Sequence, residues 1–446
     1  MQFPRHLDQK GVLPRDALQR TPLKIMLDIK FIRENPDKIK EGCRKKQVKC
    51  DIDRLLELDE KKRQLLQEIE GLKAEQNKIS EQRTKNNEQL ARAKQLKEKI
   101  KELAPDLSDA EKKLNDLSRQ IPNLPLDEVP EGKDESANKV LRQEGKKPKL
   151  SAKGGQKFQP QNYLNLTEKL DIIDIERAAK VSGTRFSYLK GGAVLLEFAL
   201  VQLALEVLNK EGFVPVVPPV MLKEKPMAGM GYLDQGADEV YHLEKDDLYL
   251  VGTSEQSMGV MHMDEILKEK ELPKRYVGFS TCFRREAGAY GKDTKGILRV
   301  HQFDKVEMFS FCLPANSKKE HLFLLSTQEK LVKLLEIPYQ VVQLSTGDLA
   351  GPSAATYDIE AWMPGQNQYR ETHSTSNCTD FQARRLNIRY RPDKNGQLAF
   401  VHTLNGTAFA IGRTLIAIFE NYQQADGSIK VPKVLKKYMG KIDQIG

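Results

Sequence analysis

The sequence is poor in cysteine: it has five, scattered along the chain, with no C-x-x-C pair. An odd, scattered set argues against a disulfide framework and against a thiolate zinc site, so we expect no structural zinc. Reduced thiols are typical of a cytoplasmic protein, and we expect that location. The cysteines are Cys43, Cys50, Cys282, Cys312 and Cys378.

Long apolar runs are also missing, since none approaches the roughly 18 apolar residues that a membrane span requires. We therefore expect no membrane partner. Residues 1–25 contain no apolar h-region and carry three prolines, which argues against a secretory signal. We interpret these residues as a flexible N-terminal extension.

Two common phosphate-binding motifs are absent, because no G-x-G-x-x-G follows an expected strand and no G-x-x-x-x-G-K-[ST] occurs. ATP would have to be held in another way. Acidic residues are the minority, and the formal net charge of +9 favours a polyanionic partner. At 446 residues the chain exceeds what one core supports, so we expect two domains.

Apolar residues recur every seven positions between about 51 and 121. One series covers 58–79 and a second covers 96–117, with a polar stretch at 84–89 between them. This spacing predicts two long helices that pair as an antiparallel coiled-coil arm.

A proline falls inside the second series. Pro105 is expected to kink or interrupt the helix, and Ser108 or Asp109 could cap a restart.

Basic residues are concentrated toward the tip of the arm. Between Lys78 and Lys101 there are eight basic residues and three acidic ones. A solvated coiled-coil surface explains such charges in an isolated arm, whereas a finger that grips phosphates explains why they gather at the tip. Candidate nucleic-acid contacts are Lys78, Arg83, Lys85, Arg92 and Lys94.

Prolines at 121–125 mark the end of the arm and a change of composition. We expect an N-terminal domain over residues 26–132, a linker over 133–160 and a second domain over 161–446. In the second domain, helical patterns (170–182 and 191–211) alternate with short β-rich runs. This order favours an antiparallel sheet in an α+β domain. The β-rich run 212–221 carries a proline pair in mid-strand, which is tolerated only at a sheet edge or an interface.

The stretch 281–309 reads TCFRREAGAYGKDTKGILRVHQFDKVEMF. Two apolar runs frame Arg284, Arg285 and Glu286, and three glycines follow in the loop. The pattern predicts a hairpin whose loop carries the charges. Surface ion pairs would also explain these charges, without any binding role. This stretch alone does not distinguish the two interpretations.

Three segments together resemble the motifs of class II aminoacyl-tRNA synthetases: 212–221 with the preceding helix, the charged hairpin, and the strand and helix at 402–421. Further stretches narrow the resemblance to seryl-tRNA synthetases of the bacterial type. They are MLDIKFIRENPDKIKEG (26–42), LDIIDIERAAKVSGTRF (170–186), GTSE (252–255), GKDTKGILRVHQF (291–303), SNCTDFQARR (376–385) and ENYQQADGS (420–428). The resemblance covers nearly everything from Met26 onward.

The resemblance implies an antiparallel class II catalytic domain flanked by helices, and a homodimer built around residues 207–221. It implies activation of L-serine with ATP and Mg²⁺, followed by transfer of serine to tRNA(Ser). It leaves open whether tRNA(Sec) is charged too. The arm is implied to contact the long variable arm and elbow of the tRNA, which it would read by shape.

The resemblance also implies the nucleotide site. Arg284, Glu371 and Arg413 match catalytic positions of the family. An arginine suits such a position because its planar guanidinium can bind a carboxylate and a phosphate that are brought close together. Glu286, two residues after Arg284, is expected on the same strand face, and Arg285 on the opposite one. Glu371 is the expected Mg²⁺ ligand. The ATP-binding set is Arg284, Arg285, Glu286, Val300, Phe303, Glu371, Thr372, His373, Ser374 and Arg413.

Serine is small, so polar groups must recognise it. Thr253, Ser254 and Glu255 match positions around the substrate ammonium group, Glu307 matches the acceptor for its hydroxyl, and Thr407 adds a further hydroxyl. A site that hydrogen-bonds a substrate hydroxyl rejects an analogue without it by roughly 10⁴ to 10⁵, so alanine should be excluded well.

Two alternatives of a different kind remain: a class II relative that loads an amino acid onto a carrier protein, and a noncatalytic tRNA-binding paralogue. The basic arm argues against the first. The joint presence of the charged site residues argues against the second. A purely structural coiled-coil protein would leave about 285 C-terminal residues unexplained.

Overall fold

The computed structural model describes residues 27–81, 86–150, 158–234, 236–288, 293, 295–392 and 396–446. The N-terminal extension, residues 1–25, lies outside the described residues.

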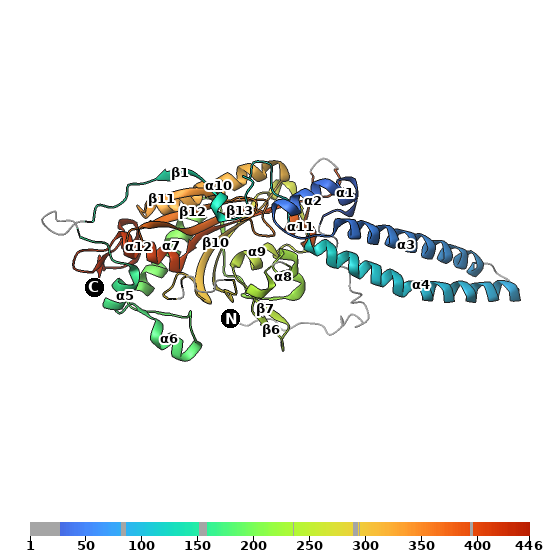
Figure 1. Cartoon of the computed structure of the whole chain (residues 1–446), viewed down its shortest axis with the longest axis horizontal. Helices are drawn as coiled ribbons and strands as arrows, with labels where there is room; N and C mark the ends of the chain where they lie inside the picture. The colour runs from blue at the N-terminus through green and yellow to red at the C-terminus, as the bar shows by residue number, and fades with distance from the viewer. Residues whose placement is uncertain are drawn as a thin grey trace, which may run out of the picture.

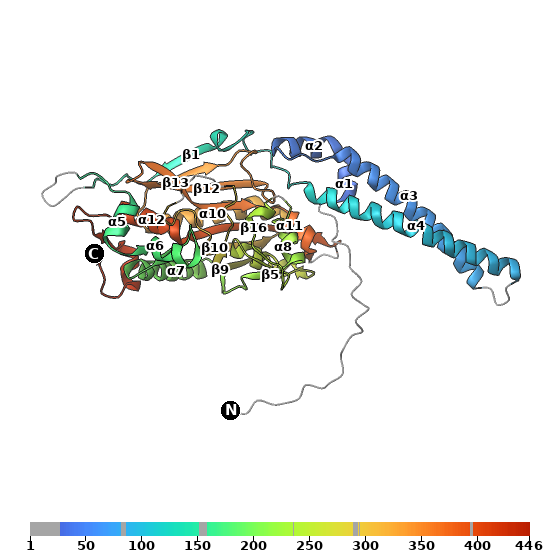
Figure 2. The ribbon, with the colours of Figure 1, turned by 60° about the horizontal axis from the view of Figure 1, so that its bottom comes forward.

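Two long helices form the arm that the heptad spacing predicts. α3 (Ile52–Ser80) and α4 (Asn87–Gln120) run side by side away from one end of the body (Figures 1 and 2). Heptad leucines such as Leu96 are buried between them. Asp51 caps α3 and Asn86 forms a capping box at the start of α4, so both helices begin at residues that satisfy their free N–H groups.

Pro105 does not interrupt α4, which is continuous from Asn87 to Gln120, so the predicted interruption with a restart at Ser108 or Asp109 is wrong. Pro105 lies on the exposed face of the helix, and so does Lys101, whose carbonyl loses its usual N–H donor. Water can therefore satisfy that carbonyl. The buried apolar residues on both sides of the proline keep α4 packed on α3.

A small hydrophobic cluster closes the base of the arm. α1 (Ile29–Glu34) and α2 (Pro36–Lys45) pack Ile32 and Ile39 against the first turns of α3 and the last turns of α4. The N-terminal segment thus has a core of its own.

The body is built on an eight-stranded sheet, which confirms the α+β class. All neighbouring strands are antiparallel except the edge pair of β4 and β9. In spatial order the strands are β1 (Lys139–Glu144), β11 (Tyr339–Gln343), β12 (Ala355–Met363), β13 (Gln368–Asn377), β16 (His402–Ala410), β10 (Gln302–Cys312), β9 (Lys274–Phe283) and β4 (Val214–Val216).

Two expectations about strands need correction. Residues 139–144 fall inside the expected linker, but they form β1 and pair with β11. Their side chains are almost all exposed, so the sequence shows no apolar alternation there. The pair Pro218 and Pro219 follows β4 instead of lying inside it, although β4 itself is an edge strand, as expected, and contains Pro215.

Helices α7 (Gly192–Lys210), α10 (Ser317–Leu334) and α12 (Ile411–Asn421) share the main hydrophobic core with one face of the sheet. On β10, Val306 and Met308 point into this core. Side chains alternate along a strand, so Lys305 and Glu307 face the other way.

Helix α7 is long and apolar enough to span a membrane by length and composition, which the sequence was expected not to contain. In the structure 56% of that stretch is buried inside the protein. Its composition is thus that of a core helix.

The predicted helix at 170–182 begins late. Asp174 accepts a hydrogen bond from the backbone of Arg177 and starts α6 (Ile175–Ser182), while the residues just before it form β2 (Ile173–Asp174). The remaining helices and strands are α5 (Tyr163–Lys169), β3 (Tyr188–Leu189), β5 (Met221–Lys223), α8 (Glu224–Met230), β6 (His242–Leu243), β7 (Leu248–Leu250), α9 (Ser254–Gly259), β8 (Ile266–Lys268), α11 (Phe381–Leu386), β14 (Arg389–Arg391), β15 (Ala399–Phe400), β17 (Ile429–Lys430) and β18 (Gln444–Ile445).

Candidate active site

A cavity of about 600 Å³ opens on the face of the sheet opposite the main core. Strands β9, β10, β13 and β16 supply its floor, and α9 and the segment 232–240 supply a wall. Its described lining includes four basic side chains and five carboxylates, so it is suited to ligands that carry both signs of charge. The charged residues are Arg284, Arg299, Lys305 and Arg413 with Glu239, Glu255, Glu286, Glu307 and Glu371.

The predicted hairpin exists and delivers Arg284 to the cavity. β9 and β10 pair antiparallel, and just past the end of β9 the backbone N–H of Arg284 donates to the carbonyl of His301. His301 returns the bond, with Nδ1 3.0 Å from the carbonyl oxygen of Arg284. The Arg284 side chain donates from Nε to the Gly252 carbonyl at 3.2 Å, and its guanidinium lies 5.3 Å from the centre of the Phe303 ring.

The neighbours of Arg284 differ in their placement. Arg285 is not among the described residues that line the cavity, and its guanidinium lies 5.9 Å from the Tyr241 ring. Glu286 does line the cavity, but not because of strand alternation: β9 ends at Phe283, and Glu286 has a left-handed backbone with φ of 51°. The carboxylate of Glu286 therefore points into the cavity because of this turn and not because of the alternation of side chains along a strand.

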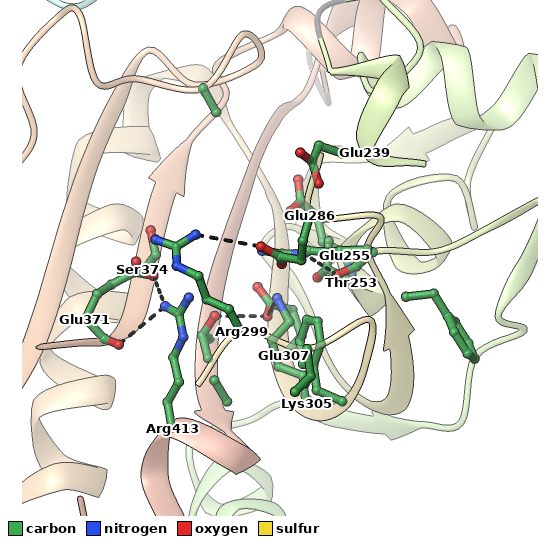
Figure 3. A pocket seen from close by; sticks show the side chains of 18 of the residues that line it. Glu239, Thr253, Glu255, Glu286, Arg299, Lys305, Glu307, Glu371, Ser374 and Arg413 are labelled. Atoms are coloured by element: carbon green, nitrogen blue, oxygen red, sulfur yellow. Dashed lines mark hydrogen bonds and ion pairs between the residues drawn. The ribbon is translucent and has the colours of Figure 1, made fainter. Parts of the chain in front are cut away.

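Arg299 is a cavity residue that the sequence interpretation did not include. Its Nη1 lies 3.7 Å from Oε2 of Glu286 (Figure 3). It comes one residue before Val300, which also lines the cavity, as does Phe303. No regular spacing predicts this position, because residues 297–300 belong to no strand.

Glu255 is buried at the start of α9. Tyr232 donates its hydroxyl to Oε2 at 2.9 Å, and Gln382 donates to Oε1 at 3.1 Å. Burial, helped by the charge of Glu307, raises the pKa of Glu255 to about 7. Thr253 also lines the cavity, whereas the hydroxyl of Ser254 points to the Gly278 carbonyl and Ser254 does not line it.

Glu307 forms a buried cluster with its neighbours on the sheet. Lys305 is ion-paired with it, and Thr407 donates its hydroxyl to Oε2 at 3.2 Å. Thr407 lies directly opposite Glu307 in the pairing of β10 with β16. Lys305 was not predicted, although it shares the strand face of Phe303 and Glu307, and period-two counting would have identified it.

Glu371 and Arg413 form an ion pair in the lining of the cavity (Figure 3). Arg413 Nη1 lies 2.8 Å from Oε1 of Glu371. Burial opposes ionisation of this carboxyl and is the largest single influence on it. The charge and hydrogen bond of Arg413, together with the charges of Arg284 and Arg299, outweigh burial and lower the pKa of Glu371. Thr372 and Ser374 line the cavity as well. His373 is not among the described lining residues; burial against the core lowers its pKa to about 4.

Among the described residues, no group of three or more His, Cys, Asp or Glu side chains could hold a metal ion without other ligands. Glu371 and Ser374 supply the kind of oxygen donors that Mg²⁺ accepts beside phosphate oxygens.

Three of the five basic residues singled out at the arm tip are described. Lys78, Arg92 and Lys94 are exposed, and Arg92 also forms an ion pair with Glu75 at 2.8 Å. Arg83 and Lys85 lie outside the described residues.

A family described as "tRNA synthetase class II core domain (G, H, P, S and T)" matches residues 239–422, and "Seryl-tRNA synthetase N-terminal domain" matches residues 26–125. The chain is 48% identical to a "Serine--tRNA ligase" of Acidothermus cellulolyticus over 421 residues, covering 93% of this chain and 98% of that protein.

Two solved structures are similar over most of the chain. One is a seryl-tRNA synthetase from Pyrococcus horikoshii in complex with ATP, with 42% identity, a TM-score of 0.85, and coverage of 94% of this chain and 99% of that one. The other is a cytoplasmic serine-tRNA ligase from Naegleria fowleri in complex with AMP, with 35% identity, a TM-score of 0.82, and coverage of 95% and 99%.

Proposed function

The chain belongs to the seryl-tRNA synthetase family, and we propose that its cavity joins L-serine to ATP and then passes the seryl group to tRNA. One observation carries the proposal: the buried carboxylates Glu255 and Glu307 lie in the same cavity as Arg284, Phe303 and Arg413. Polar carboxylates suit an amino acid with an ammonium group and a hydroxyl. A ring beside guanidinium groups suits a nucleotide.

In the activation step, a carboxylate oxygen of serine attacks the α-phosphorus of ATP. The bond from that phosphorus to the bridging oxygen breaks, and pyrophosphate leaves with the electron pair. Arg284 is assigned to both anions, because its side chain is anchored at the Gly252 carbonyl and lines the cavity. Arg413 is assigned to the phosphates, and Phe303 to the adenine ring. The relative from P. horikoshii, solved with ATP, supports nucleotide binding here.

Serine recognition is assigned to the other end of the cavity. Glu255 and Thr253 take the ammonium group, and Glu307 accepts the hydroxyl with Thr407 beside it. Alanine would leave the Glu307 cluster without its hydroxyl, so it is rejected strongly. Threonine must be rejected by its extra methyl group, and such steric rejection is weaker.

Mg²⁺ would enter with ATP, with Glu371 and Ser374 as its protein ligands, and would neutralise charge on the phosphate oxygens. In this protein Arg413 keeps Glu371 ionised before nucleotide binds. Glu371 is thus ready to accept a cation.

Transfer follows when the 3′-terminal hydroxyl of tRNA attacks the seryl carbonyl carbon and AMP leaves. We assign tRNA binding to residues 26–132, with the exposed basic residues of the arm tip as phosphate contacts. The match of residues 26–125 to the N-terminal domain of seryl-tRNA synthetases supports this division. We propose tRNA(Ser) as the substrate and tRNA(Sec) as a second one to be assayed beside it.

A homodimer in the cytoplasm is the proposed working form. Exposed apolar side chains gather on α7 and around β4, including Phe198 at 52% and Val217 at 86% exposure. An apolar surface of this kind is suited to a partner subunit.

The direct test is serine-dependent exchange of pyrophosphate into ATP. The wild-type protein should catalyse exchange with serine but not with alanine. With threonine at the same concentration, exchange should be slight. Arg284→Ala should lower the rate by at least about 100-fold, because a cation at the reacting anions is lost.

Arg391→Ala is the matched control, since Arg391 is an exposed arginine on β14 away from the cavity. If the wild-type protein catalyses exchange and also charges tRNA with serine, the proposal is distinguished from a carrier-protein ligase. Dimeric, folded wild type that exchanges with no amino acid would overturn the proposal and leave a noncatalytic tRNA-binding protein.

A further inference from the structure

One wall of the cavity is held by the N-terminal segment of the chain. The five successive carbonyl oxygens of residues 350–354 all accept hydrogen bonds from Lys46, Asn123 or Leu126, which lie more than 220 positions away in sequence. Lys46 Nζ donates to the carbonyls of Ala350 at 2.7 Å, Gly351 at 3.1 Å and Ser353 at 2.6 Å; Asn123 donates from its backbone to Gly351 at 2.9 Å and from Nδ2 to Pro352 at 2.8 Å; and Leu126 donates from its backbone to Ala354 at 2.9 Å.

Lys46 is an uncommon lysine. It follows α2 at the base of the arm and is only 7% exposed. Among the described residues it forms no ion pair with a carboxylate, so its three carbonyl contacts are what compensate the burial of an ammonium group. An apolar side chain would fill the same space without that cost. The lysine therefore has a use beyond filling space.

The other side of this segment faces the cavity. Ala350 and Ser353 are among the lining residues. Pro352 packs closely against Gly231: a Cβ atom added to this glycine would lie 3.1 Å from the proline ring. The φ of Gly231 is 90°, in the left-handed region that favours glycine. The next residue, Tyr232, donates to the carboxylate of Glu255. The wall is thus adjacent to the group assigned to the serine ammonium.

A second tether reaches the same part of the cavity. Arg119, near the end of α4, pairs with Asp234 at 3.0 Å, and the buried Arg385 pairs with Asp234 at 2.6 Å. Asp234 belongs to the segment that carries Tyr232. Figures 1 and 2 show α1 and α2 at the end of the body where the arm begins.

We propose that Lys46 is a positioning residue for serine: by fixing residues 350–354 from behind, it sets the wall against which Tyr232 and Glu255 receive the amino acid. This inference rests on the proposed function of the cavity. Lys46 touches no substrate. It makes the N-terminal domain part of the amino-acid site of its own subunit.

Lys46→Met tests the proposal, because methionine keeps the length of the side chain and removes all three donors. In pyrophosphate exchange without tRNA, the KM for serine should rise by about tenfold while the KM for ATP stays within about twofold. The dissociation constant for tRNA should also stay within about twofold, since the arm surface is unchanged. A merely structural role would lower the active fraction and leave both KM values alone.

Lys49→Met is the matched control, since Lys49 lies three residues on, is exposed, and contacts none of the residues 350–354 among the described hydrogen bonds. Asn123→Ala is the second variant: it removes the side-chain donor to Pro352 and should raise the KM for serine in the same direction even if Lys46→Met does not fold. Folded Lys46→Met, or failing that Asn123→Ala, with wild-type KM for serine overturns the inference. Failure of the proposed function is distinct, because wild type itself would then show no serine-dependent exchange.

Discussion

Two buried carboxylates lie at the end of the cavity that we assign to the amino acid, and they differ in their hydrogen-bond and ion-pair partners. Glu307 is paired with Lys305 and hydrogen-bonded by Thr407. Glu255 has only neutral donors, Tyr232 and Gln382. Burial and the nearby Glu307 charge therefore raise the pKa of Glu255 to about 7. The ammonium group of a bound substrate would supply the cationic partner that Glu255 lacks.

We expect kcat/KM for serine to depend on pH through Glu255. Below about pH 7 the free protein carries a neutral Glu255 that binds an ammonium group poorly. The value of kcat/KM should fall by about tenfold per pH unit on that side. The measurement is the pH profile of pyrophosphate exchange between pH 5.5 and 8.5.

Glu255→Gln is the control for this profile. The variant should be slower at every pH and should lose the limb near pH 7. A wild-type profile that is flat from pH 6 to 8, or an unchanged limb in the variant, would contradict the assignment of Glu255 to the ammonium group.

Single residues also show what the sequence could and could not predict. Arg284, Glu307, Glu371 and Arg413 meet in one cavity as the resemblance implies. Glu286 arrives there through a left-handed turn that strand alternation does not foresee. Arg285, Ser254 and His373 do not line the cavity in the described part of the chain, because a motif gives neighbours in sequence and not the direction of each side chain.

Among the elements, the arm was the most predictable part and β1 the least. Heptads predict α3 and α4 because burial between two helices repeats at that spacing. β1 is an exposed edge strand whose partner, β11, comes about 200 residues later, so neither composition nor local pairing reveals it. Long-range pairing of this kind is not encoded in the strand itself.

Helix α4 retains Pro105, which costs helix stability, and its replacement should stabilise the arm. Pro105→Ala restores an N–H donor for the carbonyl of Lys101, and the gain should be about 1–3 kcal/mol. Pro105→Gly is the matched control: it restores the same donor but should gain about 1 kcal/mol less. Hydrogen exchange of the amides around 101–109 reports the change, and faster exchange in Pro105→Ala would contradict it.

At the scale of the whole molecule, the arm and the cavity are joined at the arm base, and we assign different functions to them. The base contributes Lys46, Arg119 and Asn123 to the cavity wall and its neighbours. The distal half of the arm contacts no part of the body in the views of Figures 1 and 2. Chemistry on serine and ATP should therefore depend on the base, and tRNA selection on the tip.

A shortened arm separates these two tasks. Replacing residues 66–106 by a short Gly-Ser linker keeps the base cluster around Leu55 and Leu114. We expect serine-dependent exchange within about threefold of wild type, and kcat/KM for tRNA charging lower by at least about 100-fold, because the phosphate contacts of the tip are lost. Unchanged charging would show that the tip does not bind tRNA. Loss of exchange in folded protein would show that the distal arm supports the cavity directly.

The most direct test of the central claim is a crystal structure of the protein with a non-hydrolysable seryl-adenylate analogue. We expect the seryl ammonium group at Glu255 and Thr253, the seryl hydroxyl at Glu307, the phosphate mimic at Arg284 and the adenine against Phe303. The analogue bound outside this cavity, or bound in it with the adenine at Glu255 and Glu307, would contradict the assignment of the site.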